Sequence, residues 1–463
     1  MRFIGRQREI DLLDDAFAAR EAAFIPIYGR RRIGKSELIL RFMRKAPGLY
    51  FLGKTAPAAL QLRELMREAA RALGEPLLAE TSPEGYRQAF ELITSRLPAD
   101  RRFVLALDEF QWMAQASPEL PSVLQELWDR KWKRSGRILL ILCGSFIGFM
   151  EREVLGRNSP LFGRRTAQVK LGPLSHLEAA EFQPDASLAD RARTYFICGG
   201  VPLYLEMFRP GRSIEQNIEQ VILDEHSPLF REPDFLLREE LREVDSYYAV
   251  LLALAGGSAV HREVASRTHI AERSLGYYLR QLEELGYVEK KYPLTEKKPG
   301  ARSVRYGMSD PLLRFWFRFV FPNLSFLQQQ GASRTFRELI RPEIDGYFGG
   351  CFERLCRDAL PWIYRRERVS AAYRVGQYWD RDVQIDLVGL RDDAVTDLGE
   401  CKWGSYGGRK KMLAELEAKR RSYPNARGAT LIRRAFVRTL PRGADTDDPT
   451  LRWHDLDDLY ARP

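Results

Sequence analysis

The sequence predicts an α/β protein made of several domains. A short apolar run at residues 23–28 is followed by a glycine-containing loop at 29–36 and by helical spacing at 37–43. Two further apolar runs, 103–107 and 137–142, each end in polar residues, as buried parallel strands do. The chain has 463 residues, which is too long for one ordinary core, so about two to four domains are expected.

The composition is that of a folded and moderately basic protein. Hydrophobic residues make up 45% and charged residues 29%, which indicates globular domains rather than disorder. The net charge of +10 makes nucleic acid a plausible partner. Five scattered cysteines without a CxxC pair predict neither a zinc site nor a disulfide framework. With no signal peptide and no bilayer-spanning run, we expect a cytoplasmic protein without membrane contact.

The loop at 29–36 has the spacing of a phosphate-binding P-loop. It reads Gly29-Arg-Arg-Arg-Ile-Gly34-Lys35-Ser36 and lies between an expected strand and an expected helix. The backbone N–H groups of such a loop surround a β-phosphate, and the helix N-terminus adds positive potential. Lys35 is placed to bridge the β- and γ-phosphates of ATP, Ser36 to hold Mg²⁺, and Glu37 follows in the first helical turn. The alternative is a glycine turn that binds nothing.

The next two apolar runs place polar side chains at the carboxyl ends of strands, where α/β proteins bind ligands. Asp108 and Glu109 follow the first of these runs. Asp108 suits a water-mediated contact with Mg²⁺, and Glu109 is positioned to polarise the attacking water as general base. Alternatively, the acidic pair caps a helix that begins near residue 110. Ser145 follows the second run, where it can sense the γ-phosphate.

Two arginines downstream are candidates for charge stabilisation. Arg164 and Arg165 lie in a loop after residues 159–163. Their guanidinium groups can stabilise transition-state charge, either in cis or from a neighbouring subunit. Two solvated arginines in a loop are an equally good interpretation.

These elements resemble the archaeal and bacterial P-loop ATPases of the AAA+/STAND type over roughly the first half of the chain. The matching segments are the opening box Phe3-Ile-Gly-Arg6-Gln-Arg8-Glu9, the P-loop, the acidic pair, Ser145, Gly163-Arg164-Arg165 and Gly199-Gly200-Val-Pro202. The resemblance implies a P-loop NTPase core with a small helical lid and an adenine site near Arg6 and that lid. It further implies an arginine finger at Arg164 or Arg165, which leaves a homo-oligomer as an option. The consecutive arginines Arg30 to Arg32 depart from the family pattern, and their role is open.

Residues 245–306 have the pattern of a winged helix-turn-helix: helices near 250 and 264, a third helix at 271–285, and strands at 287–290 and 303–306. In this interpretation the third helix enters the major groove of DNA, and the basic hairpin tip touches phosphates. The candidate contacts are Arg273, Ser274, Tyr277 and Arg280 on the helix and Lys297, Lys298 and Arg302 in the tip. Winged helices also serve as interdomain struts or dimer pads. The aromatic-rich stretch at 310–320 is expected to be core.

The C-terminal segment predicts a helix from residue 341, which carries Glu353, followed by strands. Alternation in the first strand puts Asp386 and Val388 on one face, opposite Val383, Ile385 and Leu387. The same alternation at 394–403 puts Glu400 and Lys402 on one face. Carboxylates from two strands with a lysine two residues on are typical of divalent-metal nucleases, in which Asp386 and Glu400 would hold Mg²⁺.

The set Glu353, Asp386, Glu400 and Lys402 resembles the PD-(D/E)xK nuclease superfamily, and also the domain of unknown function often attached to this ATPase group. The resemblance covers the last quarter of the chain and implies a restriction-endonuclease-like α/β domain. Residue 384 is Gln where such motifs often carry a second acid. The alternative is an ion pair between Glu400 and Lys402 in a degenerate fold kept for binding. The basic clusters at 409–411 and 419–421 would lie along DNA, or form a solvated helix.

We therefore expect a P-loop ATPase core at 1–172, a helical lid at 173–240, a winged helix with an aromatic connector at 241–322, and a nuclease-like domain at 323–463. The expected function is ATP hydrolysis, with ATP and Mg²⁺ as cofactors, in a protein whose nucleotide state controls a DNA-acting module. One alternative is a nucleotide-switched signalling or scaffold ATPase with a C-terminal domain that only binds. A third interpretation, a DNA-binding regulator, rests on the middle segment alone.

Overall fold

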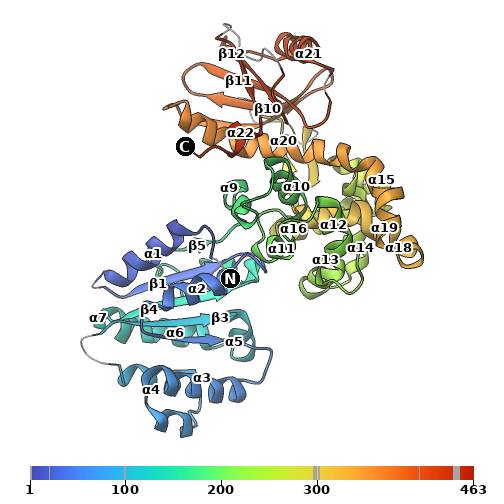
Figure 1. Cartoon of the computed structure of the whole chain (residues 1–463). Coiled ribbons are helices and arrows are strands. Elements are labelled where there is room, and N and C mark those ends of the chain that lie inside the picture. Colours follow the sequence, from blue (N-terminus) through green and yellow to red (C-terminus); the bar gives the residue numbers. More distant parts are fainter. Residues whose placement is uncertain are drawn as a thin grey trace. The chain divides into compact units, whose positions relative to one another are not determined.

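The computed structural model describes residues 3–19, 21–97, 101–295, 300, 303–405, 407–441 and 449–462. The chain divides into two compact units. Unit 1 comprises Met1–Pro173 and Val201–Leu203, and unit 2 comprises Leu174–Gly200 and Tyr204–Pro463. Figure 1 labels the elements of both units.

Unit 1 is built on one sheet, whose described strands are all parallel and follow the order β2-β3-β4-β1-β5. The strands are β1 Ala23–Tyr28, β2 Gly48–Leu52, β3 Phe103–Asp108, β4 Ile138–Gly144 and β5 Val169–Lys170. The helices are α1 Gln7–Ala18, α2 Lys35–Met43, α3 Ala58–Leu73, α4 Tyr86–Ser95, α5 Phe110–Ala116, α6 Leu120–Leu127, α7 Lys133–Ser135 and α8 Ile147–Phe149. This order makes β4 the strand that separates β1 from β3.

Helices cover both faces of this sheet, so its strands are apolar along their whole length. Phe24 and Leu105 pack in the core on the side of α3, α4, α5 and α6, whereas Ile25 and Ala106 pack in the core on the side of α1 and α2. Figure 1 shows helices on both sides of the sheet. The expected parallel α/β core is therefore confirmed.

The loop between β1 and α2 requires glycine at both ends. Gly29 has φ +153°, and a Cβ at this position would lie 2.2 Å from the carbonyl oxygen of Leu171. Gly34 has φ +88° and immediately precedes α2, which begins at Lys35. The strand, loop and helix that the sequence predicts at 23–43 are all present.

The first part of unit 2 is helical, with α9 His176–Ala179, α10 Leu188–Cys198, α12 Ile214–Asn217, α13 Pro228–Glu240 and α11 Pro202–Met207, whose first two residues belong to unit 1. Three helices and a small antiparallel sheet follow, in the order expected for residues 245–306. They are α14 Val244–Ala255, β6 Ala259–Val260, α15 His261–Thr268, α16 Glu272–Glu284, β7 Val288–Lys291 and β8 Arg305–Met308. The second hairpin strand begins two residues later than expected, and β8 pairs with both β6 and β7.

The aromatic stretch after β8 is buried, as predicted: Phe315, Trp316, Phe317 and Phe319 are all core residues. It belongs to α17 Pro311–Phe315 and the turn that continues it, and is followed by α18 Leu324–Gln330 and α19 Ala332–Thr335. The long helix α20 Arg341–Arg366 then leads into the C-terminal sheet.

The C-terminal sheet is mixed and has the order β13-β12-β11-β10-β9 in the described part of the chain. Its elements are β9 Tyr373–Trp379, β10 Gln384–Arg391, β11 Val395–Lys402, α21 Arg409–Ser422, β12 Thr430–Val437, β13 Leu451–His454 and α22 Leu456–Tyr460. β9, β10 and β11 are antiparallel, and β12 runs parallel to β11 because α21 provides the crossover. Tyr364 of α20 bonds to Asp397 on one face, whereas Met412 of α21 packs on Ala435 on the other.

One expectation about this sheet is wrong. Regular alternation placed Val388 on the face of Asp386, opposite Ile385. In the structure, Ile385 and Val388 pack together with Leu398, and the pairing of β10 with β9 shifts register between Ile385 and Val388. A β-bulge inserts one extra residue and so reverses the alternation beyond it. Asp386 lies inside this irregular step.

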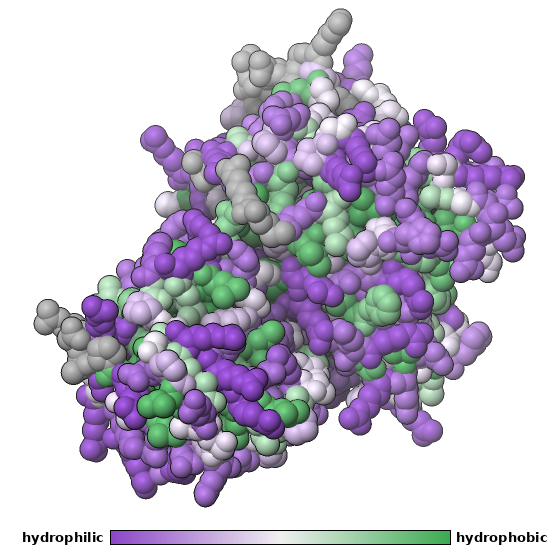
Figure 2. Space-filling model, turned by 60° about the horizontal axis from the view of Figure 1, so that its bottom comes forward, coloured by the Kyte–Doolittle hydropathy of each residue, from purple (hydrophilic) through white to green (hydrophobic). Residues whose placement is uncertain are grey.

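On the face shown in Figure 2, hydrophobic residues are scattered among hydrophilic ones. The most exposed large apolar side chain in the described ranges is that of Leu77, at 70% exposure. None of the helices described here combines the length and the apolar character needed to cross a bilayer.

Candidate functional site

The P-loop and the acidic pair meet at the carboxyl end of the unit 1 sheet. The hydroxyl of Ser36 donates a hydrogen bond of 2.6 Å to Oδ2 of Asp108. The hydroxyl of Tyr50, from the neighbouring strand β2, donates to the same oxygen, also at 2.6 Å. Asp108 is fully buried, so these bonds compensate for the loss of water around its carboxylate.

Lys35 lies inside the loop rather than in solvent. Its side chain is buried, and Nζ donates to the carbonyl oxygen of Arg30 at 2.8 Å. Burial lowers the pKa of Lys35, and the nearby Cys143 and Glu109 oppose this effect. Glu37, also a candidate nucleotide contact, is exposed on the first turn of α2.

Glu109 is held by two side chains, one that follows β4 and one from α5. The hydroxyl of Ser145, at the end of β4, donates to Oε2 of Glu109 at 2.8 Å. Nε2 of Gln111 donates to the same carboxylate and to Oγ of Ser145, the latter at 3.1 Å. Glu109 has φ +48°, an uncommon backbone conformation for a residue other than glycine, at the entry to α5. Its side chain makes no capping bond to that helix, which argues against the simple helix-cap interpretation.

Arg31, in the P-loop, stacks on an aromatic pair beside this network. Its guanidinium carbon lies 5.5 Å from the centre of the Phe146 ring. The Phe146 ring in turn meets that of Trp112 edge to face at 5.2 Å. Phe146 follows Ser145 in the chain and Trp112 follows Gln111, so this stack adjoins both residues that hold Glu109.

Arg6 ties the start of the chain to the P-loop. Its guanidinium donates to the carbonyl oxygen of Gly172 at 2.6 Å and to that of Ile33 at 3.3 Å. The residue is buried and has φ +65°, directly before α1. Arg6 is therefore a structural brace next to the phosphate loop, at the place where the resemblance implies an adenine site.

The two candidate finger arginines differ in their surroundings. Arg164 is engaged within unit 1, because its Nε and Nη2 bind the carboxylate of Asp129, at 3.0 and 2.7 Å for the shortest contacts. It also donates to the carbonyl oxygens of Pro160 and Phe162. Arg165 is exposed.

The second cluster of predicted site residues lies in the C-terminal sheet of unit 2. Burial, followed by the charges of Glu353 and Glu400, raises the pKa of Asp386 to about 7. Oδ2 of Asp386 accepts a hydrogen bond of 3.1 Å from the backbone N–H of Cys401. Burial also raises the pKa of Glu353, whose closest cation is Arg357 at 3.9 Å. The three carboxylates therefore lie close enough to interact electrostatically, although they come from α20, β10 and β11.

Glu400 forms ion pairs with two lysines. Nζ of Lys402 lies 2.6 Å from Oε1 of Glu400, and Lys419 of α21 binds Oε2 of the same carboxylate. Lys402 also contacts Glu415 at 3.3 Å. Over the ranges that the structure describes, no group of three or more His, Cys, Asp or Glu side chains is close enough to hold a metal ion.

The predicted nucleic-acid contacts of the middle segment lie on one helix face. Arg273, Ser274, Tyr277 and Arg280 are exposed on α16, whereas Leu275, Leu279 and Leu282 of the same helix are buried. Glu283 of α16 binds Lys290 of β7 at 2.6 Å, which removes one positive charge from this surface. Lys297, Lys298 and Arg302 lie outside the described residues.

The basic cluster at the end of α21 is paired. Arg420 and Arg421 contact the carboxylate of Glu417 at 2.8 and 3.2 Å, and Arg433 of β12 contacts it at 3.2 Å. Lys419 forms an ion pair with Glu400. This pairing agrees with the solvated-helix interpretation for the cluster at 419–421.

Sequence reasoning missed the residues that support the two sites from a distance. Tyr50 and Gln111 carry no motif, and their contacts arise from the strand order of the sheet. Lys419 was seen only as part of a charge run, while its contact with Glu400 comes from the packing of α21 on β11. Only the contact of Gln111 with Glu109 had a possible sign in the sequence, because the two residues are two positions apart.

A parallel sheet with a P-loop after β1 and an acidic pair after β3 defines a P-loop ATPase. Residues 3–208 match the family of ATPase domains found predominantly in Archaea. This chain is accordingly an ATPase, as the sequence predicts. Residues 316–419 match a family of archaeal and bacterial proteins of unknown function.

Over 421 residues the chain is 30% identical to the uncharacterized protein MJECL04 of Methanocaldococcus jannaschii, an alignment that covers 90% of this chain and 91% of the relative. The chain belongs to the same family as that protein. The Walker-type ATPase PABY2304 of Pyrococcus abyssi has a similar fold, with a TM-score of 0.52 and 18% identity over 68% of this chain and 96% of the other. The ORC2 protein of Aeropyrum pernix aligns with a TM-score of 0.45 and 14% identity over 70% and 94% of the two chains.

Proposed function

We propose that the chain hydrolyses ATP at the edge formed by β1, β3 and β4 and uses this cycle as a switch for its C-terminal module. The observation that supports the catalytic part most directly is the pair of contacts between Ser36 and Asp108 and between Ser145 and Glu109. Together they bring the P-loop, the acidic pair and the third strand end into one hydrogen-bonded site.

Each residue then has a chemical task. The loop from Gly29 to Gly34 surrounds the phosphates with backbone N–H groups, and Lys35 leaves the carbonyl of Arg30 to contact the phosphates. Glu109 accepts a proton from the attacking water, and Ser145 and Gln111 fix the direction of its carboxylate. Burial lowers the pKa of Lys35, and the nearby carboxylates of Glu109 and Asp108 oppose that shift.

The residues also fit a magnesium ion. The Ser36 hydroxyl and the Asp108 carboxylate lie 2.6 Å apart and offer hard oxygen atoms, so Ser36 would hold Mg²⁺ directly and Asp108 would hold it through water. Mg²⁺ bound there would neutralise charge that develops on the phosphates. Tyr50 holds the Asp108 carboxylate in place through its own hydrogen bond.

The finer assignment to the AAA+ type adds an arginine from a neighbouring copy. Arg165 suits this task better than Arg164, because Arg165 is exposed whereas Arg164 is bound to Asp129. A homo-oligomer would be needed for this contribution. The ATPase rate per subunit should then rise with protein concentration, and Arg165→Ala should remove that rise.

An assay of Mg²⁺-dependent phosphate release tests the catalytic proposal. Glu109→Gln should lower kcat by about 100-fold or more while nucleotide binding remains, because only the base is lost. Lys35→Ala should reduce both binding and turnover. The matched controls, Glu119→Gln and Lys45→Ala, change exposed residues of the same unit and should retain activity. Full turnover in Glu109→Gln would contradict the role of this residue as base.

For the C-terminal module, two functions remain in competition. The order α20-β9-β10-β11-α21-β12 and the mutual electrostatic effect of Asp386, Glu353 and Glu400 support a metal-dependent nuclease. The ion pairs of Glu400 with Lys402 and Lys419, and the lack of a three-ligand group within the described ranges, favour a domain that binds without cleaving. In the nuclease, Lys419 would have to release Glu400 before Mg²⁺ could bind.

Nicking of supercoiled DNA in Mg²⁺ and Mn²⁺ separates these two functions. A nuclease predicts nicking that is lost in Asp386→Asn and retained in Asp392→Asn, an exposed turn residue near the same strand. If the protein nicks DNA with neither Mg²⁺ nor Mn²⁺, the result supports a C-terminal domain that binds without cleaving.

A DNA contact through the winged-helix segment is a separate proposal that rests on the exposed face of α16. Arg273→Ala should weaken salt-sensitive DNA binding. Binding that does not depend on Arg273 would point to another surface.

A further inference from the structure

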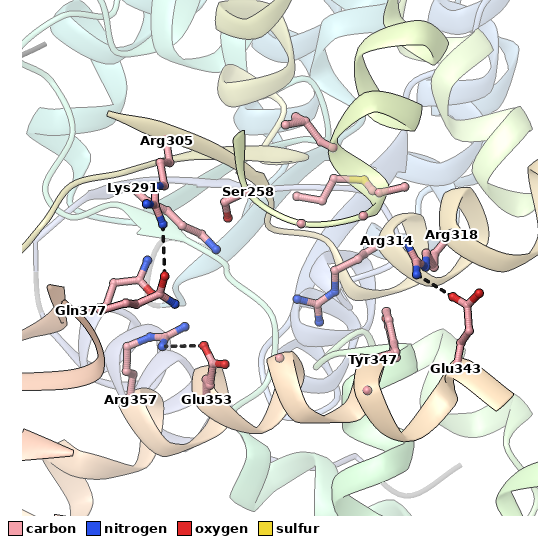
Figure 3. A pocket seen from close by; sticks show the side chains of 18 of the residues that line it. Ser258, Lys291, Arg305, Arg314, Arg318, Glu343, Tyr347, Glu353, Arg357 and Gln377 are labelled. Atoms are coloured by element: carbon pink, nitrogen blue, oxygen red, sulfur yellow. Dashed lines mark hydrogen bonds and ion pairs between the residues drawn. The ribbon is translucent and has the colours of Figure 1, made fainter. Parts of the chain in front are cut away.

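Unit 2 contains a cavity of about 620 Å³ that the ATPase site does not account for and that shares only Glu353 with the candidate nuclease residues. Its walls come from the end of α14, from β7 and β8, from α17 with the turn after it, from α20, and from β9 and β10. This volume lies in the range of small-ligand sites, which is roughly 300–1,000 Å³. Figure 3 shows the side chains that surround it.

The cavity is strongly cationic. Five of its lining residues are Lys291, Arg305, Arg314, Arg318 and Arg357, against the two carboxylates Glu343 and Glu353. The carboxylates are already engaged, Glu343 by Arg318 at 2.5 Å and Glu353 by Arg357 at 3.9 Å. Lys291 and Arg314 point towards the open space in Figure 3. An excess of three positive charges therefore faces one hollow.

Three of these cations are held at an energetic cost. Lys291 and Arg305 stand directly opposite each other in the β7–β8 ladder, an arrangement that is unfavourable for like charges. Burial is also the largest influence on Lys291 and lowers its pKa to about 8. Nε of Arg314 is buried and has no hydrogen-bond partner among the described residues. An anion in the cavity would relieve each of these costs.

Helix α20 keeps the cavity open with glycine. Gly346 and Gly350 lie one turn apart and line the hollow, and a Cβ added at either position would meet no atom within 4 Å. Glycine within a helix costs roughly 1 kcal/mol relative to alanine. No close packing requires these two glycines, and both leave the wall of the cavity without a side chain.

We propose that this cavity binds a small anion that carries two or three phosphate groups, such as a nucleoside di- or triphosphate. A single carboxylate would leave most of the positive charge uncompensated, whereas a diphosphate carries roughly three negative charges. Guanidinium groups bind phosphate oxygens in a bidentate manner, and four of the five cations are arginines. Leu254, Ala255 and Met308 add an apolar wall for the remainder of the ligand.

Titration calorimetry on the full chain tests this proposal with three probes: sodium pyrophosphate, ATP and a short single-stranded oligonucleotide. The Lys35→Ala background suppresses binding at the P-loop. We expect one equivalent of pyrophosphate or ATP to bind, with an affinity that falls as salt is added. Gly350→Leu, which fills the cavity without removing a charge, should weaken binding at least tenfold.

Gly349→Leu is the matched control, because Gly349 lies on the same helix, has the same open surroundings and does not line the cavity. The Gly349→Leu variant should bind pyrophosphate and ATP with the same affinity as the Lys35→Ala protein. Arg314→Gln provides a second test and should also weaken binding about tenfold. The proposal is overturned if no small probe binds, or if Gly350→Leu and Gly349→Leu bind equally. Binding of the oligonucleotide alone would also overturn it and would assign the surface to a nucleic-acid strand.

Discussion

Replacing Lys291 by methionine tests how much the positive charge of this residue destabilises the folded protein in the cationic cavity of unit 2. A pKa of about 8 in place of the ordinary 10.5 corresponds to a penalty of about 3 kcal/mol for the charged form in the folded protein. Burial is the largest cause of this lowered pKa, and the charges of Arg357, Arg354 and Arg314 lower it further. The carboxylate of Glu289 opposes the shift. Methionine keeps the length and the apolar stem of the side chain without the charge.

The sign of the effect depends on pH. At pH 7 both the folded and the unfolded chain hold the proton of Lys291, so the full penalty acts on the folded state. Between about pH 8 and 10.5 the unfolded chain binds more protons at this residue, and stability rises with pH as the penalty disappears. Lys291→Met should therefore be more stable than the natural protein by about 1–3 kcal/mol at pH 7. That advantage should shrink towards zero near pH 10.

Urea unfolding of both proteins at pH 7 and pH 9.5 measures this difference, since most other titrations cancel in the comparison. Lys290→Met is the matched control on the same strand. There the hydrogen bond with Glu283 raises the pKa of the lysine, so its removal should lower stability. The reasoning would be refuted by a Lys291→Met protein that is less stable at pH 7, or by a difference that does not change with pH.

Three further predictions concern buried contacts. Arg434→Ala should cost about 3–5 kcal/mol in urea unfolding, because Asp397 and Glu367 would lose the guanidinium that binds both of them within the C-terminal sheet; a loss below 1 kcal/mol would contradict this. Gly29→Ala should remove the nucleotide-binding event of the P-loop from calorimetry and leave that of the unit 2 cavity, since its Cβ would collide with the carbonyl of Leu171, whereas Gly85→Ala should retain both. Gln111→Leu should lower kcat about tenfold with little change in KM, because Gln111 donates a hydrogen bond to Glu109, the proposed base; an effect confined to KM would assign Gln111 to binding instead.

Local motifs made the catalytic core predictable. The P-loop fits within eight consecutive residues, and the acidic pair follows a fully apolar strand, so each element could be located without knowledge of its neighbours. The contact between Ser36 and Asp108 then follows from the shared edge of a parallel sheet. The role of Tyr50 could not be predicted from the sequence, because its hydrogen bond to Asp108 depends on β2 being the neighbour of β3.

The C-terminal site was only partly predictable for a related reason. Alternation located Glu400 and Lys402 on one face, and both indeed contact α21. The bulge at Asp386 has no signature in the sequence, and it changes which side chains accompany this residue. The cationic cavity was invisible as well, because its lining extends from Leu254 to Gln384 and assembles only in the folded unit.

The run of arginines inside the P-loop now has a physical explanation at two of its three positions. Arg30 acts through its backbone, since its carbonyl oxygen accepts the hydrogen bond of Lys35. Arg31 acts through its guanidinium, which lies over Phe146 and so joins the phosphate loop to the segment that carries Ser145. Ser145 in turn donates a hydrogen bond to Glu109, so a chain of contacts from Arg31 through Phe146 and its neighbour Ser145 leads from the P-loop to the proposed base.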